Sequence, residues 1–371
     1  MRVLFDVCHP AHVHLFKHAI AELRAEGHET LVTSREKEVT TQLLDAYGID
    51  HEPLSTQGEG GFGLAVEWFG RELRLLRRAR RFGPDVIVSH LNFAAAHVAT
   101  VLRRPNLVFN DNEEAARLLG PLVHPFSSLV CTPSSFAADL GEVQRRYEGF
   151  HELAYLHPDR FTPDPDVLRR HGVEPEDRYA VVRLVSWAAY HDAGREGLSA
   201  AARRELLSIL EDHGDVYVTS EAPLPDEFED YRLPVPPEAI HDLLAHADLY
   251  VGDSHTMAIE AGLLGTPSVR FNFLVDDGDL GGYDVLGDTY GLVRSTADER
   301  EGLDLVAELA ADDGARERWA ERRRRLLADT VDVTDFMLDR IYELAGVARR
   351  PVVPADRRPT RRPLAGDGGS P

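Results

Sequence analysis

The first half of the chain alternates short apolar runs with segments of helical periodicity. Residues 2–7 (RVLFDV) predict a strand, and residues 13–25 and 37–47 place apolar side chains at helical spacing. Further apolar strand candidates are residues 29–34, 49–53, 83–89, 105–110 and 127–133. Strands that are short, apolar throughout and followed by helices predict a parallel sheet that is buried on both faces.

The second half repeats this pattern and predicts a second α/β domain. Its strand candidates are residues 178–186, 215–220, 247–253 and 267–272, with a helix predicted over residues 198–213. A turn-rich stretch after residue 157 marks the boundary. We therefore predict an α/β chain of two Rossmann-like domains, residues 1–157 and 158–348. Residues 349–371 are rich in Pro, Arg, Gly and Asp without apolar periodicity, which predicts a disordered tail.

The composition indicates an acidic protein that does not bind nucleic acid. The net charge is −22 over 371 residues, and Lys17 and Lys37 are the only lysines. Such an excess of carboxylates is typical of a high-salt cytoplasm, and it lacks the positive surface that nucleic acid needs. Two cysteines, Cys8 and Cys131, provide neither a disulfide framework nor a thiolate zinc site. Without a signal pattern or a long apolar run, the expected location is cytoplasmic.

The most informative segment is residues 236–271. It predicts a helix, a short strand, a polar turn at residues 252–256, a second helix and another strand. The start of a helix that follows a parallel strand binds anions, because its free N–H groups and the helix dipole converge there. Glu260 lies one helical turn after Thr256 and faces the same way. This arrangement suits a nucleotide, with its diphosphate at the turn and its ribose diol on the carboxylate.

The segment AHADLYVGDSHTMAIEAGLLGTPSV also resembles the donor-binding segment of GT-B glycosyltransferases and of their relatives, the UDP-N-acetylglucosamine 2-epimerases. The resemblance implies two Rossmann-like domains facing a cleft, with the nucleotide sugar held by the second domain and a final helix that returns to the first. It places Ser254, His255 and Thr256 at the diphosphate and Glu260 at the ribose. His255 departs from the glycine that is usual there. The alternative is an ordinary crossover in which Ser or Thr caps the helix.

The loop after the first strand is rich in histidine, with His9, His12 and His14. Residues 10–23 and the later GHE resemble the opening of glycosyltransferases of this fold, and His12 matches a histidine beside the acceptor. Pro10 and Ala11 replace the glycine pair of those relatives. An imidazole can accept a proton near neutral pH, so His12 is a candidate catalytic base. Alternatively, the three histidines cap and solvate the helix start; a metal site formed by them has weak support from spacing alone.

Three basic residues of the second half are further nucleotide-binding candidates. Arg183 lies late in a strand, His191 follows in the next loop, and Arg270 lies in the strand after the phosphate turn. The resemblance to the epimerases implies that the first two bind phosphate oxygens, which guanidinium and imidazole groups do well. The alternative for Arg183 is a solvated cation at a strand end.

Two further groups lie at the expected cleft. His157 and Arg160 stand at the boundary between the domains, and Glu113 and Glu114 follow a first-domain strand together with Asp111. The resemblance to the epimerases implies proton transfer at the sugar for carboxylates in this region. A solvated helix start is the alternative for Glu113 and Glu114.

Neither a metal nor another cofactor is expected. Asp276, Asp277 and Asp279 resemble a metal loop, but such clusters are common in an acidic chain. One predicted helix is basic and could at most contact an anionic membrane peripherally, with its arginines on one face and Phe69, Leu73 and Leu76 on another. An exposed face of a packed helix is the alternative. These arginines are Arg71, Arg74, Arg78 and Arg81.

Taken over its ordered length, the chain resembles the GT-B superfamily and is most similar to the uncharacterised archaeal domain-of-unknown-function family 354. Three functions follow. The first is a metal-independent glycosyltransferase that moves a sugar from a nucleotide donor to a glycan or lipid-linked acceptor, with His12 as base. The second is a nucleotide-sugar 2-epimerase, although the sequence motif that the epimerases carry at this point is missing after Arg270. The third is a protein that binds nucleotide sugars without turnover.

Overall fold

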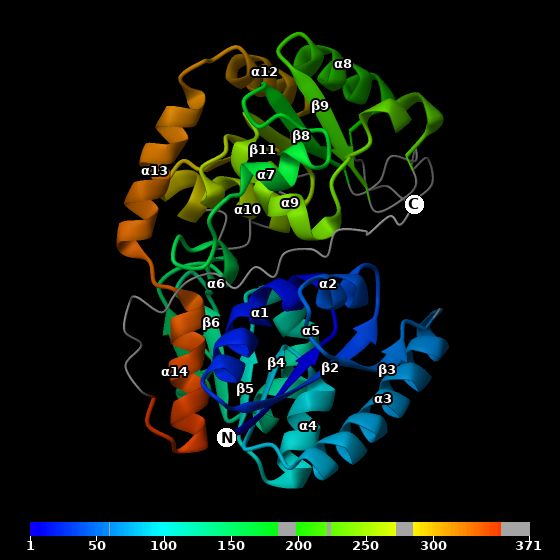
Figure 1. Ribbon diagram of the computed structural model, residues 1–371, viewed down its shortest axis with the longest axis vertical. Helices are drawn as coiled ribbons and strands as arrows, with labels where there is room; N and C mark the ends of the chain where they lie inside the picture. Colours follow the sequence, from blue (N-terminus) through cyan, green and yellow to red (C-terminus); the bar gives the residue numbers. More distant parts are fainter. Residues whose placement is uncertain (59, 185–197, 221–223, 272–284, 350–371) are drawn as a thin grey trace, which may run out of the picture.

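A computed structural model describes residues 1–58, 60–184, 198–220, 224–271 and 285–349 as two α/β lobes, each built on a parallel sheet (Figure 1). The first sheet has the strand order β3-β2-β1-β4-β5-β6-β7. Its strands are β1 (Arg2–Val7), β2 (Glu29–Glu36), β3 (Glu52–Thr56), β4 (Val86–His90), β5 (Asn106–Phe109), β6 (Leu129–Pro133) and β7 (Gln144–Tyr147).

The helices of the first domain cover both faces of this sheet. Alternate residues of β1 point to opposite sides, so that Val3 and Phe5 pack on the side of α1 while Leu4 packs on the side of α3 and α4. Burial on both faces explains why the strands are apolar throughout. The helices are α1 (Pro10–Ala25), α2 (Thr40–Ala46), α3 (Gly60–Phe82), α4 (Phe93–Leu102), α5 (Glu113–Val123) and α6 (Leu153–Leu156), with short 3₁₀ turns η1 (His124–Phe126) and η2 (Gly141–Val143).

The second sheet has the order β12-β11-β10-β8-β9, and all of its pairings are parallel. Its strands are β8 (Tyr179–Arg183), β9 (Asp215–Thr219), β10 (Leu249–Gly252), β11 (Ser268–Phe271) and β12 (Val293–Thr296). The helices are α7 (Pro165–Arg169), α8 (Ala200–Glu211), α9 (Ile240–His246), α10 (His255–Leu264), α12 (Glu299–Ala310), α13 (Ala315–Asp329) and α14 (Val333–Ala345), with the short turns η3 (Asp226–Tyr231), η4 (Pro237–Ala239) and η6 (Val285–Thr289).

Two edge strands and one boundary differ from the sequence-based expectations. β7 and β12 were not expected, because the sequences QRRY and VRST are polar and only partly buried at the sheet edges. β3 begins at Glu52, three residues later than the apolar run suggested. An edge strand needs only one buried face and therefore lacks the continuous apolar signal of the central strands.

The expected basic face of α3 is wrong for Arg71. This side chain is completely buried, and its Nη2 contacts the buried carboxylate of Asp6 in β1 while Nη1 donates to Ser34 O at 3.2 Å. Phe69 and Leu73, predicted to lie on a different face from the arginines, are 68% and 38% exposed. The buried stripe of the helix is Glu67, Arg71, Leu75 and Ala79. Arg71 therefore cannot contact a membrane, and the core side of α3 carries a charged pair that hydrophobic periodicity does not predict.

The chain crosses between the lobes twice. It leaves the first domain after α6, and α14 returns to pack against α1, β4 and β5, as seen beside α1 in Figure 1. Arg160 joins these crossings, because it forms ion pairs with Glu22 of α1, Asp332 at the start of α14 and Asp335 within it. Arg160 is only 7% exposed, so the predicted hinge contains a buried network of ion pairs.

The last described residue of the tail is ordered by α14. Arg349 forms ion pairs with Asp335 and Asp339. The rest of the predicted tail, residues 350–371, lies outside the described residues, as do His191 and the aspartates Asp276, Asp277 and Asp279. Within the described part of the chain, no helix combines the length and the apolar character needed to cross a membrane.

Candidate functional site

Histidines from three elements meet at the carboxyl edge of the first sheet. His9 caps α1, with Nδ1 accepting from Ala11 N at 3.2 Å. His12 lies one turn further, and its ring is 4.6 Å, centroid to centroid, from the ring of His90 at the end of β4. Burial, reinforced by His90 and His9, lowers the pKa of His12 well below its usual value. His12 Nδ1 lies 3.4 Å from Cys8 N, which is too long a contact to fix the tautomer.

His90 belongs to a second, deeper group with Asp111 and His151. His90 Nε2 lies 3.0 Å from Asp111 Oδ1, and the ring of His151 stands edge-on to that of His90 at 5.2 Å. His151 follows β7 and is 6% exposed, and its Nδ1 bonds the hydroxyl of Tyr147. His151 Nε2 is buried and has no hydrogen-bond partner among the described residues.

The charge states in this group follow from burial and from neighbouring charges. Burial lowers the pKa of His151 to about 4 despite the opposing effect of Asp111. Burial would raise the pKa of Asp111, but His151 and a hydrogen bond from His90 hold it far below its usual range. At neutral pH the carboxylate of Asp111 is therefore ionised and the imidazole of His151 is neutral. Such a set can accept protons, donate hydrogen bonds or bind a cation.

Glu152 and Tyr155 extend this group to the second domain. The carboxyl of Glu152 is 6% exposed, and burial together with the charges of Asp111 and Glu260 raises its pKa well above the usual range. Tyr155 donates a hydrogen bond of 2.7 Å to Glu260 Oε1, which also lies 3.0 Å from Nε2 of His241 in α9. The histidine cluster of the first domain is therefore continuous with α10 of the second.

The predicted phosphate turn lies between β10 and α10. Gly252 pairs with Arg183 of β8 on one side and with Arg270 of β11 on the other, which brings both arginines level with the turn. A Cβ at Gly252 would lie 2.3 Å from Arg183 O, so only glycine fits there. Ser254 is the N-cap residue of α10. The side chain of Ser254 makes no capping hydrogen bond to α10. It therefore does not compete with a ligand for the first backbone amides of this helix.

The side chains around this turn differ in accessibility. Thr256 is exposed, and His255 is partly buried with its Nδ1 2.9 Å from Nη1 of the fully buried Arg270. Arg183 Nη1 donates to Thr219 Oγ1 at 3.2 Å. The structure thus brings Arg183, Arg270 and His255 to one turn. Phosphate binding by these residues stays a prediction.

Glu260 lies on α10 as expected but is only 4% exposed. Its Oε1 is occupied by Tyr155 and His241, while Oε2 has no hydrogen bond within the described part of the chain. A ribose diol would therefore meet Oε2 or displace Tyr155. The ribose role stays a prediction.

The remaining predicted residues lie outside this arrangement. Glu113 Oε1 accepts from Ala137 N at 2.6 Å, and Glu114 is exposed. His157 lies beside Asp159 at the hinge, where Arg160 is held by three carboxylates. None of these four side chains is among the described contacts of His12 or His90.

The groups that sequence reasoning missed follow strands that it assigned poorly or not at all. His90 is the last residue of β4, so it could have been found from its place at a strand end. Asp111, already named from the sequence beside Glu113 and Glu114, closely follows β5. His151 and Glu152 follow β7, which the sequence did not reveal. Tyr155 and His241 give no local signal. Tyr155 reaches Glu260 from the other domain, and His241 reaches it from the neighbouring helix α9.

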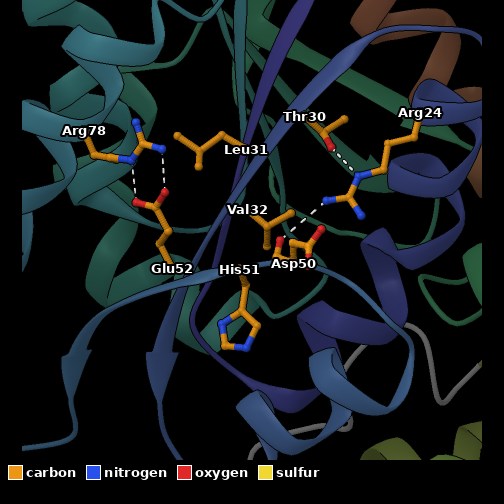
Figure 2. A pocket seen from close by; sticks show the side chains of 8 residues that line it. All are labelled: Arg24, Thr30, Leu31, Val32, Asp50, His51, Glu52 and Arg78. Atoms are coloured by element: carbon orange, nitrogen blue, oxygen red, sulfur yellow. Dashed lines mark hydrogen bonds and ion pairs between the residues drawn. The ribbon is translucent and has the colours of Figure 1, made fainter.

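One cavity lies away from this site. It encloses about 540 Å³ at the amino ends of β2 and β3, and its charged lining is internally paired, as Figure 2 shows for Arg78 with Glu52 and for Arg24 with Thr30. The candidate groups lie at the opposite, carboxyl edge of the sheet. This cavity therefore does not alter the choice of site.

Comparison with known proteins identifies the fold. A family model described as "Protein of unknown function (DUF354)" matches residues 1–346. Uncharacterized protein MJ0665 of Methanocaldococcus jannaschii is 23% identical over 276 residues, covering 72% of this chain and 80% of that protein.

Two of the similar solved structures are a putative UDP-N-acetylglucosamine 2-epimerase from Listeria monocytogenes and CalG4, the calicheamicin glycosyltransferase. The first has a TM-score of 0.68 at 13% identity and covers 95% of this chain and 98% of its own. The second has a TM-score of 0.55 at 17% identity and covers 93% and 98%. At such identities the likeness shows the fold alone, which is the GT-B arrangement of two Rossmann-like domains. These neighbours are enzymes that their names connect with sugar chemistry.

Proposed function

The chain belongs to the family described as proteins of unknown function, DUF354, and because that description names no activity we propose one from the geometry of the site. We propose that the protein is a glycosyltransferase that uses a nucleotide-sugar donor and a glycan or lipid-linked acceptor. The observation that carries the proposal is the placement of two complementary groups: an anion-binding turn in the second domain, and imidazole side chains at the facing edge of the first.

The second domain holds the donor. The amides at the start of α10 and the helix dipole attract the diphosphate, and Arg183 and Arg270 flank the same turn. Glu260 accepts hydrogen bonds from the ribose through its carboxylate. In this assignment the diphosphate is held by backbone amides and guanidinium groups and needs no metal ion. The solved GT-B neighbours include transferases and epimerases, which supports a nucleotide sugar as the ligand.

The first domain acts at the reacting end of the sugar. His12 takes the proton of an acceptor hydroxyl as that oxygen bonds the anomeric carbon and the nucleoside diphosphate leaves. Its ring lies at the end of the sheet that meets the second domain through Glu152, Tyr155 and Glu260. The proposed base and the proposed donor-binding residues are therefore on different domains, which suits transfer to a separate acceptor.

One observation favours a second candidate, a nucleotide-sugar 2-epimerase. Burial and the charge of Asp111 raise the pKa of the buried Glu152, whereas His151 and a hydrogen bond from His90 lower the pKa of the partly exposed Asp111. A carboxylate base and a carboxylic acid at one site are what proton removal and return at a sugar carbon need. No acceptor would then be required.

The two candidates are separated by one experiment. The protein is incubated with nucleotide sugars in deuterated buffer, with and without acceptor glycans and lipid-linked sugars. The transferase releases nucleoside diphosphate only with an acceptor, and His12→Ala lowers that rate by about 10²- to 10⁴-fold without changing donor affinity. Glu142→Ala, at an exposed position of the first domain, is the control that keeps full activity. Deuterium incorporation at sugar C2 without acceptor would contradict transfer and support epimerisation. Binding without either reaction would indicate a non-catalytic protein.

A further inference from the structure

Three potential metal ligands converge behind the ring of His12. One atom each of His90, Asp111 and His151 lies within 4.8 Å of the other two, and the His90 Nε2 to Asp111 Oδ1 distance is 3.0 Å. Ligands bound at about 2.0–2.1 Å around one tetrahedral ion lie about 3.3 Å apart. The group is thus near the size of a coordination sphere, and the ligand atom of His151 would need to move by at most about 1.5 Å.

His151 provides the independent reason to expect a ligand. The side chain is about nine-tenths buried, and its Nε2 has no partner among the described residues. A buried polar atom without a partner costs about 1–3 kcal/mol, so native proteins rarely leave one unsatisfied. His151 belongs to the same group as the carboxylate of Asp111, and a cation held between them would give Nε2 a partner.

We propose that His90, Asp111 and His151 bind one divalent transition-metal ion through His90 Nε2, an Asp111 carboxylate oxygen and His151 Nε2. Two imidazoles and one carboxylate select zinc, iron, cobalt or manganese over magnesium and calcium, which prefer oxygen ligands alone. Three protein ligands leave at least one position open, as in catalytic sites and unlike closed structural zinc sites. The sequence led us to expect no metal, and this inference replaces that expectation for the first domain only.

Tyr147 supplies the outer contact that such a site needs. Its hydroxyl bonds His151 Nδ1, and burial raises its pKa well above the usual value, so it stays a neutral phenol. With the hydroxyl accepting from Nδ1–H, the lone pair of Nε2 points away from Tyr147 and is available to the ion. Metal-binding histidines are typically oriented by a hydrogen bond at their other nitrogen in this way.

The ion would lie beside the proposed base. His12 stacks on His90, so an oxygen in the open position would be near the imidazole of His12. If the protein is a glycosyltransferase, the ion polarises the acceptor hydroxyl whose proton His12 removes, a role that rests on the proposed function. The existence of the site does not depend on that function, and neither does its test.

The test is metal binding by the full chain, without an activity assay. Protein treated with a chelator and dialysed is titrated with Co²⁺ and Zn²⁺ by calorimetry and by visible absorption of the Co²⁺ complex. We expect one ion per chain and a Co²⁺ spectrum typical of mixed nitrogen and oxygen ligands. A wild-type protein that binds neither ion with a dissociation constant below the millimolar range would overturn the proposal.

Variants then locate the ion. We expect His151→Asn and His90→Gln each to weaken Co²⁺ binding by more than about 100-fold, and Tyr147→Phe, which removes only the outer contact, by about 10- to 100-fold. His157→Ala is the matched control, because His157 belongs to a separate His–Asp cluster at the hinge. Unchanged binding in His151→Asn and His90→Gln, or a loss in His157→Ala, would place the ion elsewhere and contradict the proposal. Tyr147→Phe keeps all three ligands, so it decides the matter if a ligand variant fails to fold.

Discussion

Arg71 and Asp6 form a fully buried ion pair in the first domain. Both side chains are fully buried, and Asp6 also accepts hydrogen bonds from Thr33 Oγ1 at 2.6 Å and Asn92 Nδ2 at 2.6 Å. Removing one partner of such a pair leaves an uncompensated charge in a low dielectric. Arg71 therefore anchors α3 to β1 rather than serving a surface.

This anchoring predicts a large and specific loss of stability. Arg71→Ala should lower the free energy of unfolding by about 3–5 kcal/mol, as measured by urea denaturation. Arg77→Ala, at an exposed position of the same helix, is the control and should change it little. Equal losses in both variants would mean that Arg71 contributes only helix propensity.

Single residues also show where sequence reasoning reaches its limit. His12, Arg183 and Glu260 could be placed near the cleft because each stands at the end of a strand or one helical turn beyond a recognised turn. His151 and Tyr155 could not, because the strand that presents the first has no apolar pattern and the partner of the second lies on another domain. The positions of these two side chains depend on how the chain packs in three dimensions, which a local sequence pattern does not reveal.

At the scale of elements, β2 and α3 are joined by a buried ion pair between Arg35 and Glu67. Arg35 Nε lies 2.7 Å from Glu67 Oε1, and Ser55 Oγ and Gly58 N also donate to this carboxylate, each at 2.8 Å. Burial alone would raise the pKa of Glu67, but these hydrogen bonds and the charge of Arg35 lower it to about 2. The carboxylate therefore stabilises the packing of α3 only while it is ionised.

The resulting pH dependence has a definite sign. The folded-state pKa of Glu67 is below its usual value of 4.5, so its contribution is complete above pH 4.5 and is lost as the pH falls towards 2. Glu67→Gln should be less stable than the wild type at pH 7, and this difference should shrink between pH 4.5 and the lowest pH at which the protein stays folded. Urea denaturation at several pH values measures it. A difference that does not change with pH would show that Glu67 acts through packing.

The central elements were predictable from the sequence for a physical reason. A strand buried on both faces must be apolar throughout, and this made β1, β4, β5, β6, β8 and β10 recognisable. The stripe that α3 buries contains Glu67 and Arg71, so apolar periodicity assigned its faces incorrectly. Charged residues that are paired in the core are invisible to a pattern based on hydrophobicity.

At the scale of the whole molecule, Arg160 holds the two domain crossings together. It joins α1 to the start of α14 through Glu22, Asp332 and Asp335. Arg160→Ala would remove the buried cation shared by these three carboxylates, leaving Arg349 as the partner of Glu22 and Asp335, and we expect the free energy of unfolding to fall by about 3–5 kcal/mol. Differential scanning calorimetry measures the change. Arg169→Ala, which breaks only exposed pairs, is the control and should have a small effect.

The closed arrangement of the domains also connects stability with function. Tyr155 bridges to Glu260 across the cleft, so the carboxylate proposed to bind ribose also takes part in domain closure. In the proposed assignment, a nucleotide would use Oε2 of Glu260 or take the place of the Tyr155 hydroxyl. The two roles of Glu260, in domain contact and in ribose binding, can be separated by Tyr155→Phe. This variant removes the hydrogen bond between the domains but keeps the carboxylate of Glu260.

The most direct test of the account is therefore calorimetric titration of nucleotide sugars and nucleoside diphosphates into the wild type, Glu260→Ala and Tyr155→Phe. We predict that the wild type binds at least one nucleotide sugar and that Glu260→Ala loses about 1.5–3 kcal/mol of binding free energy, or about 10- to 150-fold in affinity. Tyr155→Phe should bind as well as the wild type or better. Absence of nucleotide binding in the wild type, or equal affinity in Glu260→Ala, would contradict a nucleotide-sugar site at α10.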